Sequence, residues 1–348
     1  MEISIITVFG SYNHGSYLQA LNLSKALSKY GNVQFIDYNT RQWNAFRTAY
    51  RRTKLFLRSS GQYNKFAKIA CFEIREAMII KKLWKKTVHS DKFSGDVCVL
   101  GSDEIWNIKR SVCRYPVYWG DGIACPKIAY APSINNSTDD EFEKNAQYIT
   151  YLNNIDSISV RDRHSQEVLS RYTKKRIAGV LDPTLLFDAE KVEFQNEREY
   201  IAVYSFIGQI PKEAQQKLIT FARKNNLDLI ATGQTVTWCD KTLHSREGNP
   251  FSVYKNAKYV VTSTFHGTAY AINYRKNFIA FAKGNQKIKA LLSQFGLSDR
   301  EAHHSDDIEM LFNSEIDWQS VNQRLAELRK ESFYYLEKAF ESLDVSKE

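Results

Sequence analysis

Two short β-branched runs lie on either side of an amphipathic helical pattern at the start of the chain. The runs are ISIITVF at 3–9 and VQFIDY at 33–38, and GSYLQALNLSKALSKYG at 15–31 lies between them, with Gly31 predicted just past the helix end. A strand, a helix and a strand in this order form a crossover unit, and such crossovers join parallel strands. The chain is therefore predicted to begin with a parallel α/β sheet.

The same alternation continues along the chain and starts again after a charged stretch. Short apolar runs alternate with helical patterns in the first half, and a second alternating set follows in the second half. The stretch between them, at 187–199, is charged, lacks periodicity and is predicted to be a linker. We predict two doubly wound, Rossmann-like α/β domains, 1–188 and 199–348, that face each other across a cleft, with a helix at 321–343 packed over the joint.

Length and composition narrow the class of protein. At 348 residues the chain is too long for one average domain, and 43% hydrophobic with 25% charged residues is a globular composition. No stretch approaches the roughly 20 apolar residues of a membrane-spanning helix. The opening MEISIITVFG has no basic leader ahead of its apolar run. We therefore expect a cytoplasmic protein without a spanning helix.

The cysteines are scattered along the chain, and no two of them have the two-residue spacing of a zinc or redox site. We interpret them as buried thiols and predict no metal-binding cluster, which leaves open whether a divalent metal assists the chemistry. The five are Cys71, Cys98, Cys113, Cys125 and Cys239.

The net charge of +9 is concentrated between residues 41 and 92. This segment has fourteen Lys and Arg residues against three acidic ones, and its Trp and Phe residues follow patterns typical of amphipathic helices. We predict a basic helical insertion at about 41–92. Its composition suits an anionic membrane surface, so the protein is expected at the inner face of the membrane; a solvated basic face is the alternative. No nucleic-acid partner is expected, because the segment has no recognition-helix or stacking motif.

Polar residues follow several of the predicted strands, where ligands bind in open α/β sheets. After the first strand, GSYNHGSY has the glycine spacing of a phosphate loop but places Ser16 where the lysine belongs, which excludes that kind of nucleotide site. Asn13, Gly15 and Ser16 would then bind an anion or a sugar hydroxyl at a helix N-terminus. A plain turn capped by Ser16 is the alternative.

The third strand ends in GSDEIWN, where Gly101 lets the backbone turn and Ser102 and Asp103 stand at the strand tip. Asp103 is predicted to orient or deprotonate a hydroxyl, with a helix cap as the alternative. Trp106 is predicted to contact a sugar, with core packing as the alternative.

Arg161 directly follows the strand SISV. An arginine in this place can bind a carboxylate or phosphate with two parallel hydrogen bonds. Pairing with Asp162 or Asp182 is the alternative.

His266 follows the strand at 259–264, and Gly267 and Thr268 are predicted to begin a helix whose N-terminus attracts negative charge. An imidazole there can move protons near neutral pH. A lone histidine is more often structural than catalytic. Here, however, polar residues follow four predicted strands, and their convergence favours an active site; the residue types are Asn, Ser, Asp, Arg and His.

Taken in order, these motifs resemble the polysaccharide pyruvyl transferase family. The resemblance implies a fold of the GT-B type and a transferase that moves pyruvate from phosphoenolpyruvate onto two hydroxyls of one sugar, forming a cyclic ketal. It also implies an acceptor sugar that is lipid-linked or nucleotide-linked, a cell-surface polysaccharide as product, and no cofactor beyond the co-substrate. The matching stretches are NHGSYLQAL, VLGSDEIWN, SISVRDRHS, LDPTLLF, TSTFHGTAYAI and KIKALLSQFGLSDR.

The resemblance also implies roles for individual residues. It associates Arg161 and His266 with phosphoenolpyruvate and puts Ser102 and Asp103 near the cleft, so we predict His266 as the acid or phosphate partner and Asp103 as a base. Many members have an arginine two residues before the histidine, where this chain has Thr264. The residues expected at the donor are Arg161, Thr264, Gly267 and Thr268, and the missing charge is expected from Arg275, Lys276 or Lys283.

Two other functions fit the same sequence. A GT-B glycosyltransferase with a nucleotide-sugar donor would need a pocket in the second domain that stacks the base and binds the ribose. A protein that only binds a ligand in the cleft is the second alternative.

Overall fold

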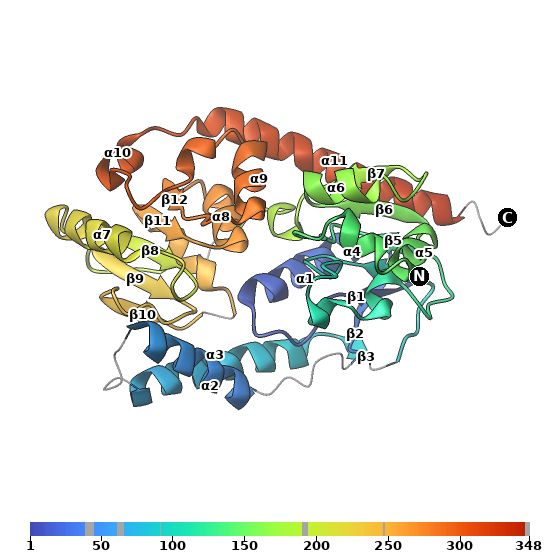
Figure 1. Cartoon of the computed structure of the whole chain (residues 1–348), viewed down its shortest axis with the longest axis horizontal. Coiled ribbons are helices and arrows are strands. Elements are labelled where there is room, and N and C mark those ends of the chain that lie inside the picture. The colour runs from blue at the N-terminus through green and yellow to red at the C-terminus, as the bar shows by residue number, and fades with distance from the viewer. Residues whose placement is uncertain (39–44, 61–65, 91, 190–193, 246–247, 345–348) are drawn as a thin grey trace.

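The computed structural model describes residues 1–38, 45–60, 66–90, 92–189, 194–245 and 248–344. Parts of the predicted insertion (41–44, 61–65 and 91) and of the predicted linker (190–193) lie outside the described residues. The rest forms two parallel sheets with helices packed on them (Figure 1).

The first sheet has seven parallel strands in the order β3-β2-β1-β4-β5-β6-β7. Chain order reverses between the neighbours β1 and β4, which is where ligands bind in doubly wound sheets. The strands are β1 (Glu2–Ile6), β2 (Asn32–Ile36), β3 (His89–Ser90), β4 (Val97–Leu100), β5 (Lys127–Ala129), β6 (Ser157–Val160) and β7 (Ile177–Gly179).

The second sheet has five parallel strands in the order β10-β9-β8-β11-β12, with the reversal between β8 and β11. The predicted fold class, two doubly wound parallel sheets in a GT-B-like arrangement, is confirmed. The strands are β8 (Tyr200–Tyr204), β9 (Asp228–Thr232), β10 (Lys241–Leu243), β11 (Tyr259–Thr262) and β12 (Phe278–Ala280).

Both faces of the first sheet are buried, as the apolar runs require. Along β4, Val97 and Val99 point into one cluster of buried side chains, and Cys98 and Leu100 point into another on the opposite face. The cluster that contains Val97 also contains Val260 of β11, so a shared apolar core joins the two halves of the molecule.

The helices that pack on the sheets are shorter than the patterns suggested. The predicted helix at 15–31 ends at Leu27, and Gly31 is not its stop; the glycine lies against the carbonyl oxygen of Met1. The segment 139–154 forms two short helices separated by a turn. The helices are α1 (His14–Leu27), α4 (Asp139–Glu143), α5 (Gln147–Asn153), α6 (Arg163–Leu169), α7 (Lys212–Lys224), α8 (Phe265–Asn273), α9 (Gln286–Gln294) and α10 (Ile308–Asn313).

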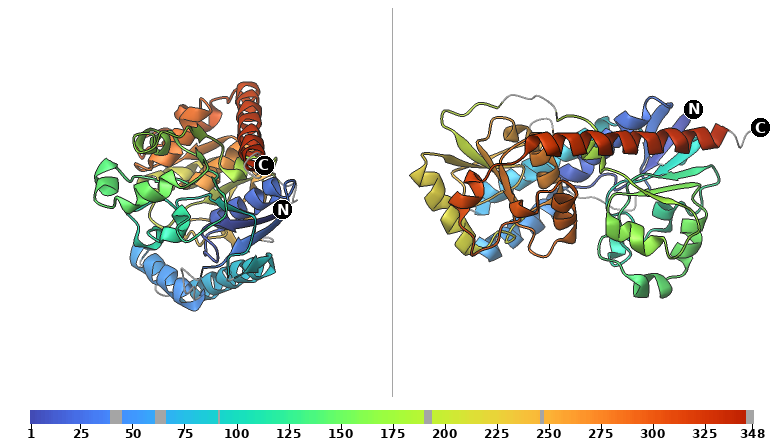
Figure 2. Two further views of the ribbon diagram at one scale, coloured as in Figure 1. Left: turned by 90° about the vertical axis from the view of Figure 1, so that its right-hand side faces the viewer. Right: turned by 90° about the horizontal axis from the view of Figure 1, so that it is seen from above.

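The C-terminal helix α11 (Trp318–Asp344) lies over the joint, as predicted (Figure 2). Near its start, Asn322 accepts a hydrogen bond from Arg275 Nε of the second half, at 2.8 Å. At the middle of the helix, Ser332 Oγ accepts a hydrogen bond from the backbone nitrogen of Leu181 in the first half, at 2.9 Å. The helix therefore ties the two sheets together.

Two helices from the basic segment, α2 (Ala45–Ser60) and α3 (Phe66–Lys86), lie on the side of the molecule opposite α11 (Figures 1 and 2). Trp84 of α3 is buried and donates a hydrogen bond to the carbonyl of Ser11, at 3.0 Å. Phe72 of α3 stacks on His244 of the second half, with ring centroids 4.2 Å apart. One side of α3 is thus packed on both halves, whereas its Lys and Arg side chains are exposed on the other side.

The cysteine prediction is correct only in part. Cys98 and Cys113 are buried, but Cys71 is exposed on α3 and Cys125 and Cys239 are half-buried. In the part of the chain that the structure describes, no three or more His, Cys, Asp or Glu side chains are placed to hold a metal ion.

Candidate active site

A cleft of about 230 Å³ lies where the carboxyl ends of the two sheets face each other. Five of the predicted residues line it: Asn13, Asp103, Arg161, Thr264 and His266. They come from the ends of β1, β4, β6 and β11, as the rule for open α/β sheets requires. The other lining residues are Glu104, Tyr204, Phe206, Gln209, Ser263, Phe265, Asn285 and Lys287.

His266 lies in the first turn of α8 with only 8% of its surface exposed. The helix begins here because Thr264 is its N-cap, whose Oγ1 accepts a hydrogen bond from the backbone nitrogen of Gly267 at 2.9 Å. The His266 Nε2 atom is buried and has no hydrogen-bond partner among the described residues. Burial lowers the pKa of His266, against the opposing effect of Asp182 and Asp103. The imidazole is therefore neutral at pH 7, with a nitrogen available to a ligand.

Gly15 of α1 fixes the other side of the imidazole. A Cβ atom at Gly15 would lie 2.1 Å from His266 Nδ1, so the first turn of α1 can approach the ring only because the residue is glycine. Asn13 caps α1 and its Oδ1 accepts from the backbone nitrogen of Gly15 at 3.0 Å. The predicted alternative, a turn capped by Ser16, is wrong because Asn13 takes that role.

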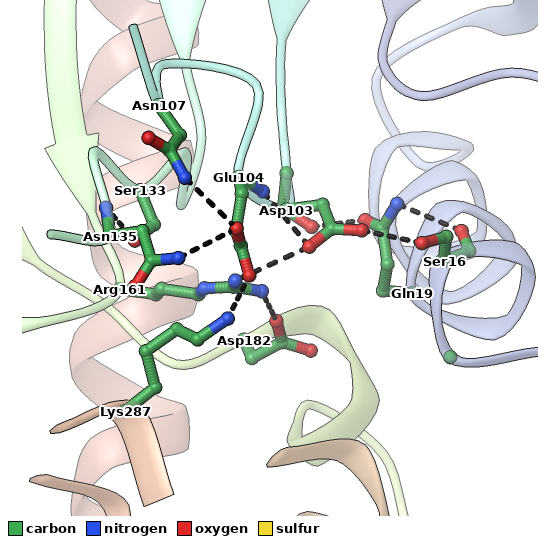
Figure 3. A network of polar contacts seen from close by, with 12 residues as sticks. Ser16, Gln19, Asp103, Glu104, Asn107, Ser133, Asn135, Arg161, Asp182 and Lys287 are labelled. Carbon is green, nitrogen blue, oxygen red and sulfur yellow. Dashed lines mark hydrogen bonds and ion pairs between the residues drawn. The ribbon is translucent and has the colours of Figure 1, made fainter. Parts of the chain in front are cut away.

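Arg161 lies between two carboxylates (Figure 3). Its Nη1 donates to Asp182 Oδ2 at 2.7 Å, and its Nη2 donates to Asp103 Oδ1 at 3.3 Å. Its guanidinium also lies 4.8 Å from the centroid of the Phe265 ring. Arg161 Nε is buried and has no hydrogen-bond partner within the described part of the chain. The pairing with Asp182 that the sequence left as an alternative is present, in a residue that also lines the cleft.

Asp103 is held as an anion. Its Oδ2 accepts a hydrogen bond from Ser16 Oγ at 2.6 Å, in addition to the pair with Arg161. Burial alone would raise the pKa of Asp103, but Arg161, His266, Ser16 and Lys287 outweigh it and hold that pKa below its usual value. Such a carboxylate is a weak base, and its contacts favour a role in positioning Ser16 and Arg161.

A backbone constraint sets the position of Asp103. Gly101 has φ of 138°, and a Cβ atom there would lie 2.0 Å from the carbonyl oxygen of Tyr130. Asp103 itself has a φ of 75°, a backbone conformation that residues other than glycine rarely adopt. The turn predicted at Gly101 is thus present and carries a strained residue to the cleft.

Lys287 and Glu104 form an ion pair across the cleft (Figure 3). Glu104 is oriented by Asn135 Nδ2 at 2.8 Å and Asn107 Nδ2 at 3.3 Å, all in the first half, whereas Lys287 comes from α9 in the second. Burial lowers the pKa of Lys287, although Asp103 opposes the shift. Both residues lie within motifs of the family resemblance, but no pattern in the sequence pointed to their pairing.

Six predicted site residues are not part of the cleft lining. Gly15 and Ser16 lie behind it, against His266 and Asp103, and the other four are buried in the interior. Ser102 is fully buried and bonds Gln19, and Trp106 is buried in the first half, where it stacks on Trp119 with centroids 4.6 Å apart. Gly267 and Thr268 are buried in α8, and the backbone nitrogen of Thr268 donates to the carbonyl of Thr264 at 3.0 Å. Trp106 therefore has the core position that the sequence left as an alternative.

The three residues expected to replace the missing arginine also lie elsewhere. Arg275 bonds Asn322 on α11, Lys276 Nζ donates to the carbonyl of Ala257 at 3.2 Å, and Lys283 Nζ donates to the carbonyl of Gly208 at 3.0 Å. The cations in the lining are Arg161 and Lys287.

Several lining residues that were not predicted follow the ends of strands in the second sheet. Tyr204 and Phe206 come at the end of β8 and Ser263 follows β11, so the strand-end rule would have found them. Gln209 and Asn285 come from loops, for which no sequence pattern gave an indication.

The model of the family described as polysaccharide pyruvyl transferase matches residues 13–285. This chain belongs to the polysaccharide pyruvyl transferase family. The match begins at Asn13, covers Asp103, Arg161 and His266, and ends just before Lys287. None of the curated proteins matches the sequence.

Solved structures with a similar fold are distant in sequence. The UDP-GlcNAc 2-epimerase of Methanocaldococcus jannaschii is 12% identical, with a TM-score of 0.50 over 94% of this chain and 99% of that one. A Listeria monocytogenes protein provisionally named UDP-N-acetylglucosamine 2-epimerase is 7% identical, with a TM-score of 0.51 over 94% of this chain and 90% of that one. For this member of the pyruvyl transferase family, these likenesses concern the fold alone.

Proposed function

We propose that the protein transfers the pyruvyl group of phosphoenolpyruvate onto two hydroxyls of one sugar in a cell-surface polysaccharide precursor. The observation that carries this proposal is the pair of buried, unpartnered nitrogens, His266 Nε2 and Arg161 Nε, among the described residues of one small cleft. Buried polar groups without a partner are rare in native proteins and call for an explanation. A bound anion would supply the missing partners.

The size of the cleft supports a small donor. Pockets for drug-sized ligands span roughly 300–1,000 Å³, and this cleft measures about 230 Å³. A three-carbon phosphate ester fits such a space better than a whole nucleotide sugar. The acceptor, lipid-linked or nucleotide-linked, would enter from the open side.

The charges around the cleft are balanced by ion pairs that a donor could exchange. Arg161 is paired with Asp103 and Asp182, and Lys287 is paired with Glu104. In the proposed complex, Lys287 breaks its ion pair with Glu104 and binds one anionic group of phosphoenolpyruvate. The Nε–H of Arg161 donates to the other, so that the carboxylate and the phosphate each gain one cation. Lys287 thereby provides the charge that the arginine at the position of Thr264 provides in many members.

His266 would move one proton in the reaction. The imidazole is neutral in the free protein, and a bound anion would raise its pKa so that it takes up a proton. The protonated ring gives this proton to the terminal carbon of the donor, and C2 becomes cationic. The first sugar hydroxyl then forms a bond to C2, and the hydroxyl proton returns to His266. The bond from C2 to phosphate then breaks, the second hydroxyl closes the ring, and its proton leaves with phosphate.

Asp103 has a supporting part in this proposal. With its pKa lowered and its oxygens bonded to Ser16 and Arg161, it orients both groups and balances the charge of the guanidinium. This replaces the role of base that the sequence suggested for Asp103.

A nucleotide-sugar glycosyltransferase remains the second candidate, on one observation. A second cavity of about 550 Å³ lies at the ends of β8 and β9 and shares Phe206 with the cleft. Phe206 and Trp238 are rings on which a base could stack. That volume lies within the usual range for ligand pockets.

Replacing Lys287 by Met is expected to weaken phosphoenolpyruvate binding by about ten- to a hundredfold, the equivalent of a charge-assisted hydrogen bond of about 1.5–3 kcal/mol. Isothermal titration calorimetry measures the dissociation constant. Lys283→Met is the matched control, because Lys283 is exposed and bonds Gly208 outside the cleft lining. Equal affinity in Lys287→Met and in the unmodified protein would exclude Lys287 from the donor site.

Gly15→Ala is expected to lower kcat of pyruvyl transfer by about a hundredfold, because the added methyl group displaces the His266 ring by about 1 Å. Steady-state assays of phosphate release measure the change. Gly179→Ala is the control, since a Cβ atom there would meet nothing closer than 3.7 Å. A fully active Gly15→Ala protein would contradict the placement of the ring.

A further inference from the structure

The outer side of α3 carries an apolar strip that no described part of the chain covers. A shallow groove on this helix is lined by Ala67, Ala70, Cys71, Ile74, Arg75, Met78, Ile79 and Lys82. Met78, in this lining, has 56% of its surface exposed. Large apolar side chains exposed along one strip mark an interaction surface more often than a solvated one.

Basic side chains lie along the same helix. All six of its Lys and Arg residues are exposed: Lys68, Arg75, Lys81, Lys82, Lys85 and Lys86. The acidic residues of α3, Glu73 and Glu76, are both buried on its inner side. The outer side of α3 is therefore apolar and positively charged, with no acidic side chain to offset the charge.

We propose that the outer face of α3 binds an anionic lipid bilayer. An amphipathic helix with apolar residues and Lys or Arg on its outer side lies in the headgroup region of a membrane, where apolar burial and attraction to anionic lipid act together. Each Lys or Arg near such a surface strengthens binding roughly fivefold. In the part of the chain that the structure describes, no helix has both the length and the apolar character needed to cross a bilayer, so α3 would bind at the surface.

The inner side of α3 connects this surface to the cleft. Glu76 accepts a hydrogen bond from Ser245 Oγ at 2.9 Å and lies 3.0 Å from His14 Nε2, and these partners belong to the second and first halves. Glu73 accepts from Thr235 Oγ1 at 3.0 Å. His14 is the first residue of α1, directly after Asn13 of the cleft lining.

These contacts fix the orientation of the protein on the membrane. With α3 on the bilayer, both halves are held by the same helix, and the cleft lies at a set height above the lipid headgroups. On the proposed function, such placement suits an acceptor sugar that is attached to a lipid in that bilayer. Binding to lipid does not require the proposed reaction, so the two can fail separately.

Flotation of the full-length protein with lipid vesicles tests this inference in the absence of any substrate. The probes are vesicles of phosphatidylcholine alone and vesicles with about a third phosphatidylglycerol, each at low and at physiological salt, where screening differs. We expect binding to the anionic vesicles at least tenfold tighter than to the neutral ones, and weaker binding at higher salt. Equal recovery with both vesicles, or none with either, would overturn the inference.

Three double variants separate the parts of the surface. Lys82→Glu with Lys86→Glu removes charge, and Ile74→Ser with Met78→Ser removes apolar contact; each is expected to weaken anionic-vesicle binding at least tenfold. Lys144→Glu with Lys174→Glu is the matched control, because it makes the same charge change at exposed residues after α4 and α6 and is expected to change binding less than twofold.

The control variant also identifies the alternative. A loss as large in the control pair as in the α3 pair would mean that net charge, and not this face, controls binding, which would contradict the proposal. A second outcome would also contradict the proposal. In that outcome Ile74→Ser with Met78→Ser leaves vesicle binding unchanged, and Lys82→Glu with Lys86→Glu abolishes binding to single-stranded DNA. The surface would then bind a nucleic acid and not a membrane. If the α3 variants release phosphate at the wild-type rate with a soluble acceptor, membrane binding and catalysis are independent of each other.

Discussion

Replacing His266 by Asn is expected to lower kcat of pyruvyl transfer by at least about a hundredfold, the lower end of what a positioned acid or base contributes. The side chain is buried in the cleft lining and its Nε2 has no partner among the described residues, so its loss removes a group available to the donor and not a structural contact. Asn keeps a polar side chain that ends one bond short of the Nε2 position. Thermal unfolding of the variant is expected to match that of the unmodified protein.

The proton of His266 gives this prediction a second measurement. Because burial holds the pKa below its ordinary value in the free protein, phosphoenolpyruvate binding at pH 7 is expected to take up a proton, which calorimetry in two buffers of different ionisation enthalpy detects. The uptake is expected to fall in His266→Asn. Unchanged uptake together with unchanged kcat would remove His266 from the mechanism.

The same shift sets the sign of a pH effect on stability. As the pH falls below the ordinary histidine value of about 6.5, the unfolded chain takes up a proton before the folded protein does. His266 therefore lowers the free energy of unfolding as the solution becomes acidic, between 6.5 and its lower folded-state pKa. Above that range both states are neutral and the residue has no effect of this kind.

Arg161→Met is expected to destabilise the protein by about 3–5 kcal/mol, because it leaves two buried carboxylates, Asp103 and Asp182, without their cation. Urea unfolding measures the change. Adding Asp182→Asn to the variant removes one of the uncompensated charges, so the double variant is expected to regain part of the lost stability. The effects of the two changes are therefore non-additive.

A loss below 1 kcal/mol in Arg161→Met, or additive effects in the double variant, would show that the carboxylates do not depend on this guanidinium. Arg163→Met is the matched control, since Arg163 is highly exposed and pairs with Glu167 one turn away on α6. It is expected to change stability by less than about 0.5 kcal/mol.

The parts of the site that the sequence predicted are those that depend on local structure. Each strand end is encoded by an apolar run followed by polar residues, and parallel strands bring their carboxyl ends to one edge. Asn13, Asp103, Arg161 and His266 were found in this way and line one cleft.

The contacts that the sequence did not predict depend on how the two halves meet. Gly15 touches the His266 ring, and Lys287 pairs with Glu104, only because the sheets face each other at this distance. No local pattern encodes that distance. The same reason applies to the contacts of Glu73 with Thr235 and of Glu76 with His14, which join residues more than 60 positions apart.

Short elements were missed for a different reason. The strands β3 and β10 have two and three residues, too few for an alternating pattern, and they exist because a neighbouring strand offers backbone partners. Trp106 was open to two interpretations because an aromatic residue after a strand has the same sequence context in a core and in a cleft.

The most direct test of the account is turnover. Purified protein would be mixed with phosphoenolpyruvate and a panel of lipid-linked and nucleotide-linked galactose, glucose and mannosamine acceptors, and phosphate release followed together with product mass. The account predicts one phosphate for each acceptor that gains the mass of pyruvate less one water, and no product with His266→Asn. Consumption of a nucleotide sugar with no change in phosphoenolpyruvate would contradict it and establish a glycosyltransferase instead.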